Sequence, residues 1–151
     1  MKVTIGIDPG KSGAVAIISI GSVYAVPFGD DSIALTIKEA AELYDIQDDN
    51  VFCYIESVHA FPGQGVSSAF AFGRAFGEAL GALDSLGVPY KLVSPQAWQK
   101  TLPDMPKKKD GATEHKRALK QEAQRRFPSA KPTLKTCDAL LIAEYGARDR
   151  I

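Results

Sequence analysis

Three short apolar runs, separated by glycine-containing turns, begin this sequence and restrict the folds it can adopt. They span residues 3–7, 13–20 and 22–27. Each run is too short for a stable helix but has the usual length of a β-strand. Short turns of this kind join neighbouring antiparallel strands. The sequence therefore predicts an antiparallel meander at its N-terminal end.

Helix and strand patterns alternate after this meander, which is typical of an α/β protein. We expect strands over residues 51–56 and 89–94, and a loop over residues 105–111. We expect helices over residues 32–44, 67–86, 96–100, 113–127 and 136–148, with Ser32 as the N-cap of the first. No internal repeat or linker interrupts the pattern, so we expect a single domain over residues 1–151.

Composition excludes several classes of protein. The 151 residues are 45% hydrophobic, enough for one ordinary core, but no apolar run approaches the ~20 residues of a membrane span. The N-terminus lacks a signal-peptide pattern, and we expect a cytoplasmic protein. Cys53 and Cys137 lie in apolar surroundings and predict two reduced, buried thiols.

The charge is zero overall but unevenly distributed. Residues 1–90 carry 4 Lys/Arg and 11 Asp/Glu, a balance of −7, whereas residues 91–135 carry 12 Lys/Arg and 4 Asp/Glu, a balance of +8. The last sixteen residues add −1. Solvated helix faces would explain a single lysine cluster. An acidic centre beside a basic face is instead typical of metal-dependent enzymes that act on nucleic acids.

Three carboxylates lie at the borders of apolar stretches. Asp8 ends the first strand, Glu56 ends the central strand, and Asp138 begins the last helix. Each has an ordinary structural alternative: an Asp-Pro-Gly turn for Asp8, a strand-end charge for Glu56 and a helix N-cap for Asp138. Carboxylates near a core are costly unless a positive charge accompanies them. Three of them at one end of a sheet would bind Mg²⁺ or Mn²⁺, which prefer oxygen ligands.

Five segments together resemble a known family. They cover residues 6–13, 55–56, 70–81, 94–100 and 138–143. In this order they are similar to the RuvC-type Holliday junction resolvases of the ribonuclease H-like superfamily, and most similar to the short phage-borne members. The resemblance implies a five-stranded mixed sheet flanked by helices, a homodimer, and paired metal-dependent nicks across a four-way DNA junction.

The resemblance also implies roles for individual residues. Asp8, Glu56 and Asp138 would be the catalytic residues and would hold Mg²⁺ or Mn²⁺. We expect Phe61 to stack against DNA bases, although it could equally cover the core, and we expect Trp98 to belong to the core. The expected DNA-binding residues are Lys11, Phe61, Lys100, Lys107, Lys108, Lys109, Lys116, Arg117 and Lys120.

One position departs from the family pattern. The family usually has an acid or a histidine three residues before the last-helix aspartate, and this chain has Lys135 there. Leu141, Ile142 and Tyr145, which share a helix face with Asp138, offer no substitute ligand. Either three acids suffice and Lys135 contacts the scissile phosphate, or the metal site is weakened.

Glycines 73, 77 and 81 form a stripe with four-residue spacing on the long predicted helix. A glycine costs a soluble helix ~1 kcal/mol relative to alanine, so such a stripe indicates close approach of another backbone. That backbone would be either the sheet of the same chain or the helix of a partner subunit.

Two other functions remain as alternatives. A junction-binding protein without catalytic activity would explain Lys135. An actin-like or sugar-kinase-like ATP-binding lobe would explain the Asp8-to-Gly10 loop, but it leaves the basic segment without a role. A nuclease assay would identify the first, and calorimetry with ATP the second.

Overall fold

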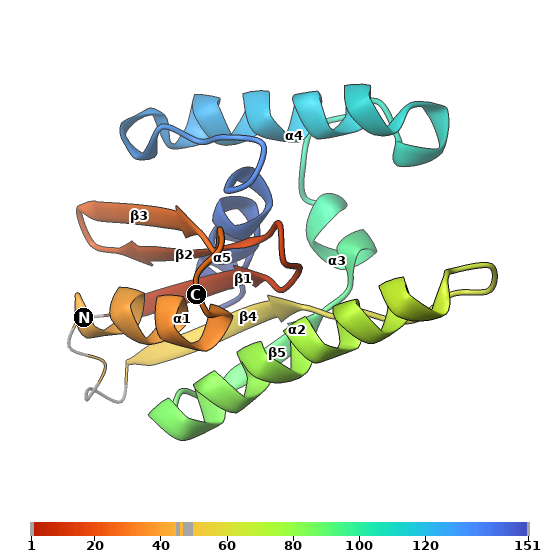
Figure 1. Ribbon diagram of the computed structural model, residues 1–151. Helices are drawn as coiled ribbons and strands as arrows, with labels where there is room; N and C mark the ends of the chain where they lie inside the picture. The colour runs from red at the N-terminus through yellow and green to blue at the C-terminus, as the bar shows by residue number, and fades with distance from the viewer. Residues whose placement is uncertain (1, 45, 47–49, 151) are drawn as a thin grey trace.

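Five strands form one mixed sheet in the computed structural model, which describes residues 2–44, 46 and 50–150 (Figure 1). The strand order is β3-β2-β1-β4-β5. β1 (Val3–Asp8), β2 (Ala14–Ser19) and β3 (Ser22–Pro27) form the predicted antiparallel meander. β4 (Val51–Glu56) pairs parallel to β1, and β5 (Tyr90–Val93) pairs parallel to β4. The predicted five-stranded mixed sheet is confirmed.

The helices also lie where the sequence places them, with ends shifted by a few residues. The Ser32 hydroxyl accepts a hydrogen bond from the Leu35 N–H (3.2 Å), which confirms the predicted N-cap of α1. The loop before α4 contains a short 3-10 turn, η1 (Lys108–Asp110), and a second one, η2 (Pro128–Ala130), follows α4. The helices are α1 (Ile33–Glu42), α2 (Val66–Leu86), α3 (Pro95–Gln99), α4 (Ala112–Arg126) and α5 (Cys137–Asp149).

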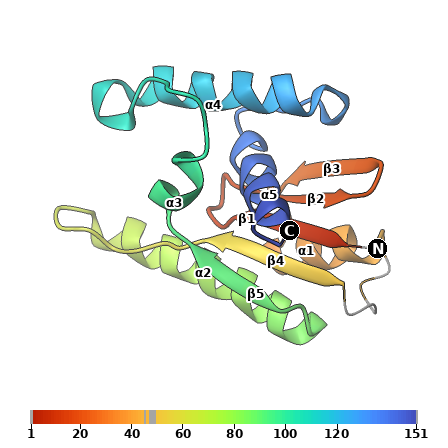
Figure 2. The ribbon, with the colours of Figure 1, turned by 180° about the vertical axis from the view of Figure 1, so that it is seen from behind.

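The two faces of the sheet are covered by different helices, as the front and back views show (Figures 1 and 2). Alternate β1 residues Val3, Ile5 and Ile7 belong to the core that includes α1 and α2. The intervening β1 positions therefore point to the other face, where α5 packs on β1, β2 and β4. Asp8 has the parity of Gly6, so both point toward α5.

Gly6 brings α5 unusually close to the sheet. A Cβ atom at Gly6 would lie 2.3 Å from the Ala139 carbonyl oxygen and 2.4 Å from the Ala143 nitrogen. Both are backbone atoms of α5, so a glycine is required for this approach. Because Asp138 immediately precedes Ala139 in α5, the close approach carries its carboxylate to the end of β1.

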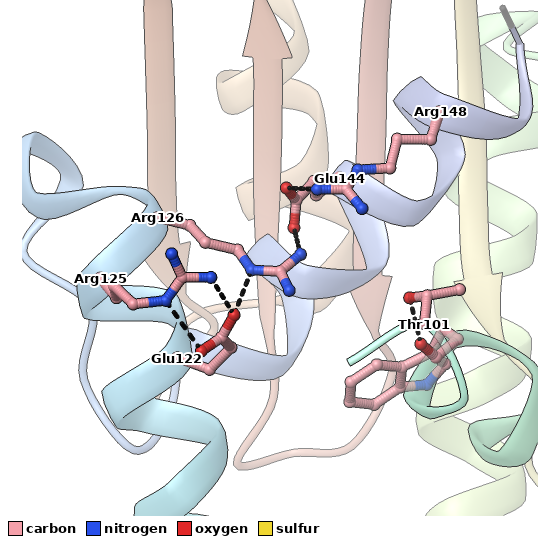
Figure 3. A network of polar contacts seen from close by, with 7 residues as sticks. Thr101, Glu122, Arg125, Arg126, Glu144 and Arg148 are labelled. Atoms are coloured by element: carbon pink, nitrogen blue, oxygen red, sulfur yellow. Dashed lines mark hydrogen bonds and ion pairs between the residues drawn. The ribbon is translucent and has the colours of Figure 1, made fainter. Parts of the chain in front are cut away.

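A network of charged side chains holds α4 against α5 (Figure 3). Glu122 accepts hydrogen bonds from Arg125 Nη2 (2.6 Å) and Arg126 Nε (2.5 Å), and Arg126 also pairs with Glu144 of α5. The hydrogen bonds from Arg125, followed by those from Arg126, lower the pKa of Glu122 to about 2. The network therefore stays ionised at neutral pH and fixes the position of α4, which carries Lys116.

Several smaller predictions can be compared with the structure. Cys53 and Cys137 are both free and buried, as expected. A Cβ atom at Gly73, Gly77 or Gly81 would meet nothing within 4 Å, so the glycine stripe does not face the sheet of its own chain, and that alternative is wrong. None of the helices in the described part of the chain has the length and apolarity that a membrane crossing requires.

Candidate active site

The three predicted acids come from three elements that meet at one end of the sheet. Asp8 is the last residue of β1 and Glu56 the last of β4. The parallel register pairs Ile7 with Ile55, so the next residue of each strand, Asp8 and Glu56, lies at neighbouring strand ends. Asp138 is the second residue of α5, inside its first turn, so it is not the N-cap of that helix.

Burial and mutual repulsion raise the pKa values of two of these acids. Burial, followed by repulsion from Asp138, raises the pKa of Asp8 to about 6. Burial, followed by repulsion from Asp8, raises the pKa of Glu56 to about 7. The two carboxylates therefore lie in an environment that favours either a bound proton or a nearby cation.

Lys116 of α4 provides one such cation. Its Nζ lies 2.8 Å from Oδ2 of Asp138. Burial is the largest single influence on Lys116 and lowers its pKa. The attraction of Asp138, its hydrogen bond to Asp138 and the weaker attraction of Cys137 and Asp8 together outweigh burial, so the pKa is raised. Lys116 also opposes the rise in the pKa of both Asp8 and Glu56. Of the predicted DNA-binding residues, Lys116 is thus the one that directly contacts an acid of the site.

Trp98 orients the second acid. Its indole is fully buried, and Nε1 donates a hydrogen bond to Glu56 Oε2 (2.8 Å). The hydroxyl of Thr101 donates to the Trp98 carbonyl oxygen (2.7 Å), which closes the end of α3 (Figure 3). The prediction that Trp98 belongs to the core is confirmed. Its contact with Glu56 was not predicted.

Two hollows open beside the acids, and Lys116 lines both of them. The first, which we call the Asp8 hollow, has a volume of about 420 Å³. Its lining comprises Asp8, Gly10, Lys11, Ser12, Gly13, Ser68, Ala71, Phe72, Lys116, Leu134 and Lys135. The second, the Glu56 hollow, also has a volume of about 420 Å³. Its lining comprises Glu56, Pro95, Gln96, Gln99, Lys108, Ala112, His115, Lys116, Leu119 and Asp138.

The acids do not form a preassembled metal site. Within the described part of the chain, no three His, Cys, Asp or Glu side chains form a group that could hold an ion. Two of the acids instead have protein partners: Asp138 forms an ion pair with Lys116, and Glu56 accepts a hydrogen bond from Trp98. The donor chemistry nevertheless fits a hard cation: three carboxylates at one rim, two of them with a raised pKa.

The structure brings some of the predicted DNA-binding residues to this site and leaves others outside it. Lys11 lines the Asp8 hollow, Lys108 lines the Glu56 hollow, and Lys116 lines both. Phe61 is 63% exposed, so the alternative that it covers the core is wrong. The predicted basic residues that line neither hollow are Lys100, Lys107, Lys109, Arg117 and Lys120.

Lys135 lies at the rim of the site, as its position before α5 requires. It is exposed and lines the Asp8 hollow together with Asp8 and Lys116. The remaining acids of α5 are engaged elsewhere: Glu144 with Arg126 and Arg148, and Asp149 with Lys91. The expectation that α5 supplies no substitute for the missing fourth acid is therefore confirmed.

The sheet and the helices around it define a ribonuclease H-like fold. Among solved structures, the chain is similar to Thermus thermophilus RuvC in complex with a Holliday junction substrate, with a TM-score of 0.64 and 17% identity over 99% of this chain and 96% of that one. It is also similar to a second T. thermophilus RuvC structure, with a TM-score of 0.62 and 18% identity over 98% and 96% of the two chains. The predicted resemblance to RuvC is confirmed at the level of the fold. No family model matches the sequence, and no curated protein does.

Proposed function

We propose that residues 1–151 act as one resolvase domain, a structure-specific endonuclease that cuts four-way DNA junctions by metal-dependent hydrolysis. The proposal rests on one observation: Asp8, Glu56 and Asp138 lie together beside Lys116 at one end of the sheet. The RuvC structure of the same fold that is bound to a Holliday junction supports the choice of substrate.

Each side chain has a role in this proposal. Asp8, Glu56 and Asp138 would hold Mg²⁺ or Mn²⁺, which when bound polarises the attacking water and stabilises charge on the leaving 3′ oxygen. The Trp98 N–H holds one oxygen of Glu56 in place and leaves the other available. Lys116 would move from Asp138 to the DNA phosphate when a cation arrives at the acids, because both cations compete for the same carboxylate.

The same proposal assigns the DNA contacts. Lys11 and Lys108, which line the two hollows, would contact phosphates near the cut. The remaining basic residues would contact DNA phosphates farther from the cut. Phe61 lies exposed in the loop that follows β4. A phenyl ring stacked on a junction base contributes ~1–3 kcal/mol.

A labelled four-way junction tests the proposal. We expect symmetric nicks in Mg²⁺ or Mn²⁺, binding without cleavage in EDTA, and much weaker binding to linear duplex of the same length. A chain that leaves the junction intact in both metals but still binds it would support the non-catalytic alternative. A chain that neither binds nor cuts would contradict both.

A homodimer completes the proposal, since a four-way junction offers two symmetry-related strands to cut. The outward glycine stripe on α2 leaves room for a second backbone, and the nearby Phe70 is 73% exposed. Two copies related by a twofold axis through α2 would cover both features. Sedimentation equilibrium measures the mass in solution and so tests the dimer directly.

Lys135 is the observation that favours the non-catalytic alternative, and replacing it separates the two functions. Lys135→Asp would add a carboxylate at the rim of the Asp8 hollow and remove a competing cation. We expect this variant to cut junctions at lower Mn²⁺ than the natural chain, with little change in junction affinity in EDTA. A metal titration of cleavage rate on one junction measures the difference.

Lys131→Asp is the matched control, because it makes the same charge change outside both hollows. Its backbone is left-handed (φ 49°), a conformation that aspartate tolerates. If Lys135 instead contacts the phosphate, Lys135→Asp will be equal or worse at every metal concentration and the metal-site interpretation is wrong.

The raised pKa values of Asp8 and Glu56 predict how metal and pH combine to set stability. An acid with a raised pKa binds its proton more tightly in the folded state, so its stabilising contribution is present below pH ~4 and is lost as the pH rises through about 6 and 7. A bound cation relieves the same repulsion. We therefore expect Mg²⁺ or Mn²⁺ to raise the melting temperature clearly at pH 8 and little at pH 5.

Thermal unfolding at both pH values, with metal and with EDTA, measures this effect. At a hundredfold excess over Kd, a ligand that binds only the folded state contributes ~2.7 kcal/mol, which is a shift of several degrees. Equal shifts at pH 5 and pH 8 would mean that the cation binds elsewhere.

A further inference from the structure

The segment between α3 and α4 carries Lys107, Lys108 and Lys109 past the Glu56 hollow, which Lys108 lines. Within the segment, the Asp110 N–H donates to the Lys107 carbonyl oxygen (3.0 Å), and the Gly111 N–H donates to the Lys108 carbonyl oxygen (3.3 Å). These bonds shape the 3-10 turn η1. They do not attach the segment to the body of α4, which carries Lys116.

A histidine of α4 makes that attachment. His115 is buried near the start of α4, and its Nδ1 lies 2.7 Å from the carbonyl oxygen of Pro106. A carbonyl oxygen can only accept, so Nδ1 carries the proton and donates. Pro106 directly precedes the lysine run, and His115 directly precedes Lys116. The bond therefore joins the lysine segment to the residue next to the Asp138 partner.

The second ring nitrogen has a different environment. With Nδ1 protonated, neutral His115 has Nε2 as an acceptor, and the ring lines the Glu56 hollow. His115 could therefore act through either nitrogen: through Nδ1 on the lysine segment, or through Nε2 on a bound ligand. The bond that the structure contains is the one made by Nδ1.

We infer that His115 is a positioning residue which, through Pro106, holds the Lys107–Lys109 segment over the Glu56 hollow so that Lys108 is ready to meet DNA phosphate beside the acids. The inference rests on the proposed function for the identity of the ligand. A segment that is already ordered loses less conformational entropy on binding, and this is the advantage that the bond provides.

Two substitutions distinguish the nitrogens. The amide nitrogen of asparagine can replace Nδ1 of histidine, whereas that of glutamine reaches the position of Nε2. We expect His115→Asn to cut a junction within about twofold of the natural chain, and His115→Gln to lose about five- to tenfold, as expected for one lost hydrogen bond. Lys108→Ala should lose a similar factor, and the His115→Gln/Lys108→Ala double variant should lose no more than Lys108→Ala alone.

Hydrogen exchange provides a measurement that needs no DNA. The amides of Asp110 and Gly111 should exchange faster in His115→Gln than in the natural chain or His115→Asn. Unchanged exchange in His115→Gln, or a loss of cleavage in His115→Asn but not in His115→Gln, would overturn the inference.

Should both variants unfold, nitrogen NMR of the natural chain decides, because a proton on Nε2 instead of Nδ1 would exclude the bond to Pro106. If the natural chain cuts no junction, the proposed function fails, while exchange still decides whether His115 holds the segment.

Discussion

Replacing Asp8 by Asn should abolish junction cleavage and leave junction binding in EDTA nearly unchanged. The variant keeps the shape of the side chain but removes a carboxylate. That carboxylate interacts electrostatically with both Asp138 and Glu56. Metal ions supply several kcal/mol of transition-state stabilisation, so at ~1.4 kcal/mol per tenfold we expect a loss of at least about a hundredfold. Single-turnover cleavage of a labelled junction measures the loss.

Stability provides the control for this variant. Because burial and repulsion disfavour the charged form of Asp8, its neutral replacement should not lower the melting temperature at pH 8. Asp104→Asn, which changes an exposed loop aspartate outside both hollows, should cut as the natural chain does. Nicking at the natural rate by Asp8→Asn would remove Asp8 from the active site.

Replacing Gly6 by Ala should cause a large loss of stability. The new methyl group would overlap the Ala139 carbonyl oxygen and the Ala143 nitrogen, and neither backbone atom can rotate away. Overpacking of a core costs ~1–3 kcal/mol when side chains can adjust, so a clash with a helix backbone should cost at least ~3 kcal/mol. Urea unfolding followed by circular dichroism measures the change.

The same substitution should weaken cleavage, because displacement of α5 moves Asp138 away from Asp8. Gly65→Ala is the matched control, since its Cβ would meet nothing within 4 Å and its φ of −60° suits any residue. Because Gly65 is the N-cap of α2, where glycine is preferred over alanine, that control should lose no more than about 1 kcal/mol. A Gly6→Ala protein as stable as the Gly65→Ala protein would show that α5 can move off the sheet at little cost.

Local sequence patterns predict the sheet and the positions of the three acids because each depends on neighbouring residues. An apolar run that ends in an acid specifies both a strand and a carboxylate at its end, as in β1 and β4. The hydroxyl of Ser32 specifies the start of α1 for the same reason. The fold resemblance then followed from the order of these local signals.

Contacts between distant segments could not be predicted in this way. Trp98 and Glu56 are 42 residues apart, and no periodicity links an indole on a short helix to a particular carboxylate. The position of α4 depends on the charges of the buried Glu122 and the half-buried Arg126 and Glu144, which the sequence presents as ordinary surface residues. Unless the position of α4 is known, the sequence does not distinguish Lys116 from the other basic residues, although Lys116 is the one that pairs with Asp138.

The indole that holds Glu56 also makes the site optically observable. Trp98 is the chain's single tryptophan, so all indole fluorescence of a folded molecule originates at one ring. Its N–H donates directly to Glu56, and its emission therefore responds to the charge on that carboxylate. Proton uptake, cation arrival and DNA docking each change that charge or its surroundings. The natural protein thus contains its own spectroscopic probe, and every step of assembly at the acids can be timed by stopped flow without a label.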